Sequence, residues 1–250
     1  QILLVGQFRD STLVNDDIAP AVNNVNLHGF YSSFSSQDGA LNWWKAIESL
    51  HGKEGVYLTK SFPSKDQIIL IGSFADSIVI ENDTIVSREK SKDAIIINSG
   101  SSGSVNWVNF ISGTLDDEAH SLLIDENDHI FVSGHYASPF LKTDYDTPDS
   151  LFTASNKGGT DLFMSRYSTD GQLNWLQTTG GRGDERISES ELFGEQIIVS
   201  GYYSDSLVWG DNTVTTKGAA DKDLFMGYMD SEGAYTYIKT LTGTGNSHEE

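Results

Sequence analysis

The sequence predicts an all-β protein built from about four visible copies of one repeat of about 65 residues, each a four-stranded blade of a β-propeller. Three observations support this fold class. An apolar run ending in glycine recurs four times, a second glycine-and-aromatic pattern recurs in the same phase, and helical periodicity is almost absent. A linear β-solenoid is the alternative, although its coils are usually shorter than this repeat.

The first recurring feature is an apolar run with an aromatic residue two positions after its terminal glycine. The runs begin at Ile2, Ile68, Ile130 and Ile197, and 66, 62 and 67 residues separate their glycines, which are Gly6, Gly72, Gly134 and Gly201. Glycine inside a strand indicates a bulge or a close approach of another backbone. We therefore expect one such approach in each repeat.

The second recurring feature is a glycine that precedes an aromatic residue by four positions. Its copies are Gly39 with Trp43, Gly103 with Trp107, Gly171 with Trp175 and Gly233 with Tyr237. Ten residues earlier stands Gly29 in the first copy and an aspartate in the others, namely Asp93, Asp161 and Asp223. Asp-Gly between two strand-like runs is typical of a tight hairpin. Residues 161–177 are therefore predicted to form strand, turn and strand, with the tryptophan packed between blades.

Further strand-like pieces complete each repeat. Residues 206–209 and 212–216 flank a turn at Gly210-Asp211, and a glycine-rich acidic loop at 180–185 leads into a strand at 187–193. Only Trp44–Leu50 has a helix-like pattern, and it aligns with strand in the other copies. The predicted repeats cover residues 1–55, 56–119, 120–186 and 187–250 of one β-propeller repeat region.

Composition restricts the class of partner. The formal net charge of -20 repels phosphate backbones, so nucleic acid is not expected to bind. No apolar run approaches the roughly 18 residues of a membrane-spanning helix, and the absence of cysteine excludes disulfides. Because the chain begins inside a predicted strand, we expect it to be a piece of a longer chain with further blades in a larger propeller. A ring closed in permuted order is the alternative.

The repeat resembles the bacterial β-propeller repeat called SBBP. The copy at 129–186 has the features of that pattern, which are Ser133-Gly134, Asp161-Leu162-Phe163, Asp170-Gly171, Trp175 and the Gly180–Glu185 loop. The first copy departs from it at Gly29. The resemblance implies a secreted protein, or one on the extracellular face of the outer membrane, of Bacteroidetes-type bacteria. It supplies no catalytic residues.

Few residues suggest reactive chemistry. The oxygen-rich loop with Asp144, Asp146 and Asp149 is a candidate Ca²⁺ site, whereas Asp125–Asp128 is interpreted as a β-turn. No other cofactor is expected. Asp116–Glu118 and Asp184-Glu185 are interpreted as solvated loop charges, and the repeat itself explains Arg182-Gly-Asp184, the integrin tripeptide. The six histidines have no metal-ligand spacing.

These observations favour a non-enzymatic extracellular binding or scaffolding module of a surface protein, which contacts protein or glycan, for example in adhesion. One alternative is a polysaccharide-acting enzyme with carboxylates at the propeller channel. Its distinctive residues would lie near Asn23–His28, where the first repeat deviates. The other alternative is a structural spacer in a larger secreted assembly, for example a type IX secretion cargo.

Overall fold

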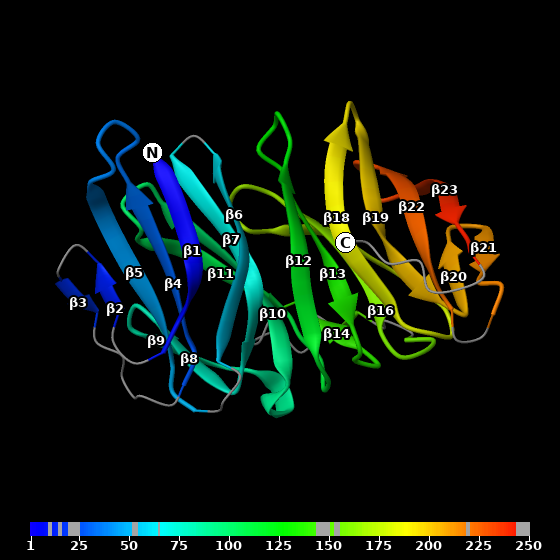
Figure 1. Cartoon of the computed structure of the whole chain (residues 1–250), viewed down its shortest axis with the longest axis horizontal. Coiled ribbons are helices and arrows are strands. Elements are labelled where there is room, and N and C mark those ends of the chain that lie inside the picture. Colours follow the sequence, from blue (N-terminus) through cyan, green and yellow to red (C-terminus); the bar gives the residue numbers. More distant parts are fainter. Residues whose placement is uncertain are drawn as a thin grey trace. The chain divides into compact units, whose positions relative to one another are not determined.

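The protein is an all-β chain in the computed structural model, as the sequence predicts (Figure 1). The structure describes residues 1–9, 12–14, 17–19, 26–51, 55–64, 66–143, 151–152, 156–218 and 221–243. Within these ranges the one helical element is a short 3₁₀ turn, η1 (Arg88–Lys90). None of the described helical structure has the length and apolar character needed to cross a membrane.

The strands form four principal antiparallel sheets. The first contains β1 (Ile2–Phe8), β4 (His28–Phe34) and β5 (Leu41–Ser49), so residues 44–49 are strand and not helix. The other three sheets each have four strands in the same pattern of order. They are β6 (Val56–Ser64), β7 (Gln67–Ala75), β10 (Lys92–Gly100) and β11 (Val105–Ile111); β12 (Asp117–Ile124), β13 (Ile130–Tyr136), β16 (Asp161–Tyr167) and β17 (Leu173–Thr179); and β18 (Glu185–Phe193), β19 (Gln196–Ser204), β22 (Lys222–Asp230) and β23 (Tyr235–Leu241).

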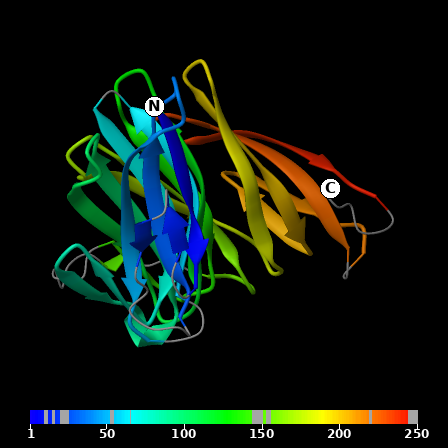
Figure 2. The ribbon, with the colours of Figure 1, turned by 60° about the vertical axis from the view of Figure 1, so that its left-hand side comes forward.

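The chain packs as two compact units, residues 1–119 with 142–150 and residues 120–141 with 151–250. Four short hairpins accompany the large sheets: β2 (Thr12–Val14) with β3 (Asp17–Ala19), β8 (Ser77–Ile80) with β9 (Asp83–Val86), β14 (Leu141–Lys142) with β15 (Leu151–Phe152), and β20 (Ser206–Trp209) with β21 (Asn212–Thr215). Figure 2 shows the twisted ribbon of β18, β19, β22 and β23 in the second unit.

A short hairpin of one repeat extends the sheet of the repeat before it. In the first unit, β8 pairs with β5, which makes the first sheet five-stranded. In the second unit, the Val208 amide donates to the Gly180 carbonyl at 3.2 Å, directly after β17 ends. The predicted turn at Gly210 has a φ of 60°. Consecutive repeats therefore share backbone hydrogen bonds as well as side-chain contacts.

The glycine of the apolar run is needed for close packing. A Cβ on Gly72 would lie 1.9 Å from the Tyr57 carbonyl oxygen, and one on Gly201 would lie 2.0 Å from that of Arg186. The strand register shifts opposite these glycines, between Leu58 and Lys60 and between Ile187 and Glu189. The bulge thus lies in the neighbouring strand, and glycine leaves room for it.

The second glycine of each repeat forms the predicted hairpin turn, with φ values of 73°, 83°, 87° and 90° at Gly39, Gly103, Gly171 and Gly233. The tryptophan of one repeat lies on the turn of the next. Trp43 Nε1 donates to the Ser101 carbonyl at 2.8 Å, and Trp175 Nε1 donates to that of Ser231 at 3.1 Å. A Cβ on Gly103 would be 2.7 Å from the Trp43 ring. We call this arrangement the ring-on-turn contact.

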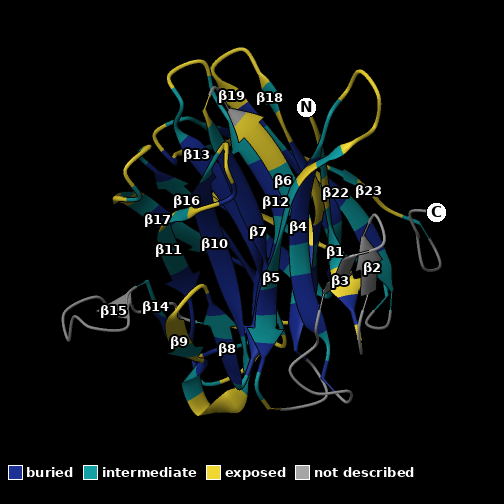
Figure 3. Ribbon diagram, turned by 90° about the vertical axis from the view of Figure 1, so that its left-hand side faces the viewer, coloured by how far each residue is buried: buried dark blue, intermediate teal, exposed yellow. Residues whose placement is uncertain are grey.

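Among the described residues, each unit contains a large apolar core cluster. In the first unit the core includes Leu70, Phe74, Ile95 and Ile97, and in the second it includes Met164, Val199, Trp209 and Phe225. Figure 3 shows β7 and β10 buried along most of their length. Strands covered on both faces have continuous apolar runs, which explains why the repeat is visible in the sequence.

The ring-on-turn contact predicts unequal effects of the same substitution. Gly39→Ala should destabilise the protein by about 1 kcal/mol through its positive φ alone, because, its chain neighbours aside, no described residue comes within 4 Å of the added methyl. Gly103→Ala should cost about 2–4 kcal/mol, since overpacking against Trp43 adds to the same backbone strain. Urea unfolding of the two variants measures this difference. Equal losses would contradict a role for the ring.

Candidate functional site

The recurring aspartates are buried, and each accepts a hydrogen bond from the backbone of a loop. For Asp93 and Asp161 this loop precedes their strand, and for Asp223 it follows the last strand of the sheet. The carboxylates of Asp93, Asp161 and Asp223 accept backbone N–H groups of Arg88 at 2.8 Å, Lys157 at 3.0 Å and Gly243 at 3.2 Å. All three side chains are almost fully buried. These positions stabilise the repeat and do not face a ligand.

Asp161 and Glu185 form a buried acid pair. Glu185 Oε2 accepts the Gly181 amide at 2.7 Å, while Glu185 Oε1 and Asp161 Oδ1 have no donor among the described residues. Burial, followed by the neighbouring Asp161 charge, raises the pKa of Glu185 to about 9, and burial also raises the pKa of Asp161. A proton shared between the two carboxyl groups would satisfy both oxygens. The sequence interpretation of Glu185 as a solvated loop charge is therefore wrong.

The same spacing of 24 residues separates Asp93 from Asp117, and both of these side chains are also buried. Asp117 was likewise expected to be solvated, and that expectation is also wrong. The acidic loops therefore place a carboxyl group inside the sheet in two successive repeats. The acid at this position belongs to the buried structure of the repeat, although the acidic residues next to it in the sequence suggest a solvated loop.

The other loops singled out in the sequence have local roles. Asp184 of the Arg-Gly-Asp tripeptide accepts the Thr160 amide at 3.2 Å. Asp125 Oδ1 accepts the amides of Asn127 at 2.9 Å and His129 at 2.8 Å, so this segment is the predicted turn. The candidate calcium ligands Asp144, Asp146 and Asp149 lie outside the described residues.

The deviating segment of the first repeat is used within the first unit. The buried side chains of Asn26 and His28 both bind the backbone of Ser49. Asn26 Nδ2 donates to the Ser49 carbonyl at 2.9 Å, and the Ser49 amide donates to His28 Nδ1 at 3.1 Å. His28 also contacts Phe8, with ring centroids 5.2 Å apart. Residues 23–25 lie outside the described ranges.

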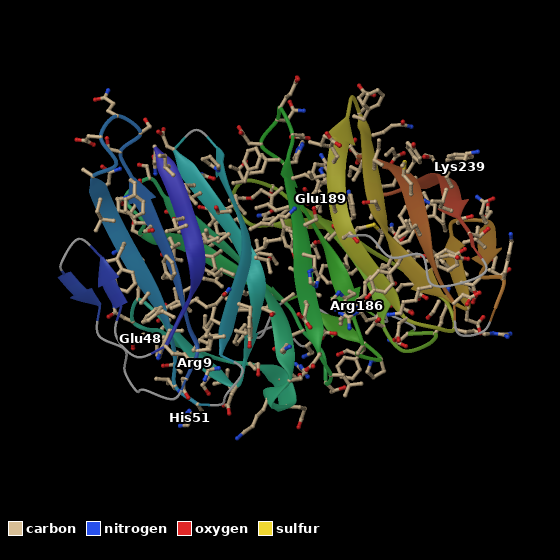
Figure 4. The ribbon with its side chains drawn as sticks, in the orientation of Figure 1. Arg9, Glu48, His51, Arg186, Glu189 and Lys239 are labelled. Atoms are coloured by element: carbon tan, nitrogen blue, oxygen red, sulfur yellow. The ribbon has the colours of Figure 1, made fainter. Side chains whose placement is uncertain are left out.

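The structure brings together a histidine pair that sequence spacing does not reveal. His120 on β12 and His135 on β13 stack with ring centroids 4.6 Å apart, and Glu118 lies two residues before His120. These three side chains could hold a metal ion. However, the guanidinium of Arg186 on β18, which Figure 4 labels, binds His135 Nε2. Its positive charge opposes a cation, and a donor at Nε2 removes that ligand atom.

A small cleft in the second unit is the better candidate site. It has a volume of about 240 Å³ and lies among three hairpin turns. Its walls include the turn after β12, with Asp125–Asn127, the turn after β18, with Gly194 and Glu195, and Ser231 of the turn after β22. Phe131 and Leu192 supply apolar lining. Figure 1 shows the turns after β12 and β18 as projecting loops.

Fixed charges surround this turn cleft. Arg166 Nη1 binds Glu232 at 2.6 Å, and its guanidinium lies 5.8 Å from the centre of the Phe131 ring. His129 Nδ1 lies 2.8 Å from Asp125 Oδ2. Glu126 and Glu195 are exposed carboxylates that also line the cleft. Acidic groups beside the apolar lining of Phe131 and Leu192 suit a basic, partly apolar side chain.

Sequence reasoning missed this cleft, because its residues come from turns that differ between the repeats. No repeated residue marks it in the sequence. Only the fold brings Asp125–Asn127 to the same cleft as Gly194 and Glu195.

Comparisons with known proteins give two weak similarities, which suggest a repeat protein. No family model matches it. It is 23% identical over 224 residues to an uncharacterized WD repeat-containing protein of Acanthamoeba polyphaga mimivirus, covering 76% of this chain and 16% of that protein. It is 25% identical over 164 residues to the regulatory protein FlaEY of Caulobacter vibrioides, covering 62% of this chain and 16% of that protein. The chain thus spans a small part of these relatives. The first similarity agrees with a β-rich repeat.

The buried acid pair predicts stability that falls as pH rises. The pKa of Glu185 is higher in the folded state than in the unfolded chain, so folding binds a proton, and stability is lost between about pH 4.5 and about pH 9. Glu185→Gln supplies a permanent donor to Asp161. It should flatten this slope and raise stability at pH 8 by roughly 1 kcal/mol or more.

Urea unfolding between pH 5 and pH 9 measures the slope. Glu191→Gln, which changes an exposed carboxylate on the same strand, is the matched control and should leave the slope as it is. Equal slopes in the wild type and Glu185→Gln would contradict the shared proton.

Proposed function

We propose that this chain is a non-enzymatic binding and scaffolding module whose turn cleft receives a basic side chain of a protein partner. The observation that carries the proposal is the cleft itself, with Asp125, Glu126 and Glu195 in its lining beside the apolar Phe131 and Leu192. A rigid sheet scaffold with varied turns suits recognition, because the turns change while the strands keep their positions.

Charge supports the choice of a basic partner. With 36 acidic and 16 basic residues, the chain attracts cationic surfaces at long range. Contacts at the cleft would then supply the specific part of the affinity. Because His129 already binds Asp125 and Arg166 binds Glu232, the carboxylates of Glu126 and Glu195 are the ones directed to a partner.

The proposal extends to architecture and location. We infer that the repeats are blades of a propeller, which agrees with the recurring sheets and with the WD-repeat similarity. That they are of the SBBP type is inferred from the sequence resemblance alone. We also infer a secreted or outer-membrane surface location, on the resemblance alone. Surface biotinylation of intact cells of the producing organism tests this location.

A labelled tetralysine peptide tests the cleft. The double variant Glu126→Gln with Glu195→Gln should weaken binding about five-fold, which corresponds to about 1 kcal/mol, because two lining charges are lost. The control, Glu191→Gln with Asp211→Asn, removes the same two formal charges from exposed positions outside the cleft lining. Fluorescence anisotropy at about physiological salt compares the two.

Equal weakening in both double variants would show that bulk charge alone binds the peptide, and the cleft proposal would then be wrong. Release of reducing sugar from a polysaccharide panel by the purified chain would contradict a non-enzymatic role. A glycan array identifies the other partner class, and selective glycan binding that survives the cleft substitutions would place recognition elsewhere on the chain.

A further inference from the structure

A second hollow in the second unit has the opposite charge to the turn cleft. Its volume of about 600 Å³ is in the range of sites that bind small molecules. One wall is the hairpin of β20 and β21, which Figure 1 labels. The other wall comes from the loops before β16 and after β17, which contribute Lys157, Gly181 and Arg182. We call this hollow the hairpin groove.

The face of the hairpin that lines the groove carries hydroxyl groups. The two strands pair so that Ser206 lies opposite Thr215 and Val208 lies opposite Thr213. Because side chains alternate along a strand, these four share one side, whereas the next residue, Trp209, is buried in the core. This wall of the groove therefore offers three hydroxyls around one apolar side chain.

The corresponding hairpin of the first unit, β8 with β9, has fewer hydroxyls on the same face. There Val86 pairs with Ser77 at the position where Thr215 pairs with Ser206. The third hydroxyl is therefore not required by the structure of the repeat.

Two basic side chains border the hydroxyl face. Lys157 and Arg182 are exposed, and within the described ranges neither forms an ion pair. The second repeat has Glu89 and Thr114 at the same distances from its recurring aspartate, so the repeat does not explain this basic pair. Asp205 is the acidic residue of the lining. The groove is thus locally positive in a chain with 36 acidic and 16 basic residues.

The loops that carry the two cations are held against each other and against the hairpin. The Gly159 amide donates to the Gly183 carbonyl at 2.8 Å, and the Arg182 amide donates to Ser206 Oγ at 3.2 Å. A Cβ on Gly181 would lie 1.6 Å from the Ser206 carbonyl oxygen, so this approach requires glycine. The backbone of the groove is therefore fixed before a ligand arrives, which lowers the entropic cost of binding.

We propose that the hairpin groove binds a short acidic saccharide through its oxyanion, which is a carboxylate or a sulfate ester. The guanidinium of Arg182 can hold such a group by two parallel hydrogen bonds, and Lys157 adds a second positive charge. The hydroxyl face suits the hydroxyls of the sugar ring. Asp205 opposes a bare anion, but its carboxylate can accept a hydrogen bond from a sugar hydroxyl.

The charge of the chain limits the ligand to a short one. With a net charge of -20, the surface beyond the groove repels a long polyanion. A ligand with one anionic group near the two cations is less affected, because salt at physiological strength screens exposed charges over about 8 Å. The preferred ligand is therefore a mono- or oligosaccharide with a single acidic group, or the acidic end of a chain.

Three sugars with the same ring test the proposal: galactose, galacturonate and galactose 6-sulfate. They carry a hydroxyl, a carboxylate and a sulfate ester at the last carbon. Titration of the isotope-labelled chain, followed by amide chemical shifts in NMR spectra, measures their dissociation constants. At least one acidic sugar should bind about five-fold more tightly than galactose, with shifts at Gly181, Arg182 and Ser206. The tighter acidic sugar identifies the source of the oxyanion.

Substitutions test the residues of the groove. Arg182→Gln and Lys157→Gln should each weaken binding of the acidic sugar about five-fold, because each removes a cation from the site. The control, Lys239→Gln, removes the same formal charge from an exposed position outside the groove lining and should leave binding unchanged. Thr215→Val should weaken binding about two-fold through loss of one hydroxyl. Circular dichroism verifies the folding of these variants.

Equal weakening by Arg182→Gln and Lys239→Gln would show that overall charge binds the sugar, and would overturn the groove as the site. Galactose binding as tightly as both acidic sugars would overturn the oxyanion. Inorganic sulfate binding as tightly as galactose 6-sulfate would overturn the saccharide.

The hairpin groove and the turn cleft share no lining residue. The double variant Glu126→Gln with Glu195→Gln should therefore keep its affinity for the acidic sugar, and loss of that affinity would contradict a separate site. Either proposal can fail without the other, because the peptide and the sugar are measured on different variants.

Discussion

The contact between a tryptophan of one repeat and the hairpin turn of the next is the interaction on which the rest of the structure depends. A single antiparallel sheet cannot bury both of its faces, so each repeat needs a neighbour. The indole ring covers apolar surface, and its N–H satisfies a backbone carbonyl in the turn. The turn glycine satisfies two requirements at once, because it adopts a positive φ and leaves space for the ring. This explains why glycine and aromatic residue recur in the same phase.

Buried polar groups inside the repeats also have structural roles. Buried aspartates accept backbone N–H groups of loops that would otherwise lose hydrogen bonds on burial. The Asp161–Glu185 pair goes further, because two acids close together are tolerated when one is protonated. Most of the recurring acidic and aromatic residues thus make contacts that stabilise the fold. The residues available to contact a partner are those that differ between repeats, chiefly in the turns around the cleft.

The sequence by itself determined the strands, the hairpin glycines and the recurring order of the sheets, because periodicity and turn chemistry are local properties. It also located close backbone approach at Gly72 and Gly201. It could not determine that Glu185 is buried, that His135 stacks on His120, or that Asp125 and Glu195 line one cleft. These relations join residues far apart in the chain, and sheet register and packing decide them. Only the tertiary structure shows which recurring side chains meet a following repeat and which remain exposed.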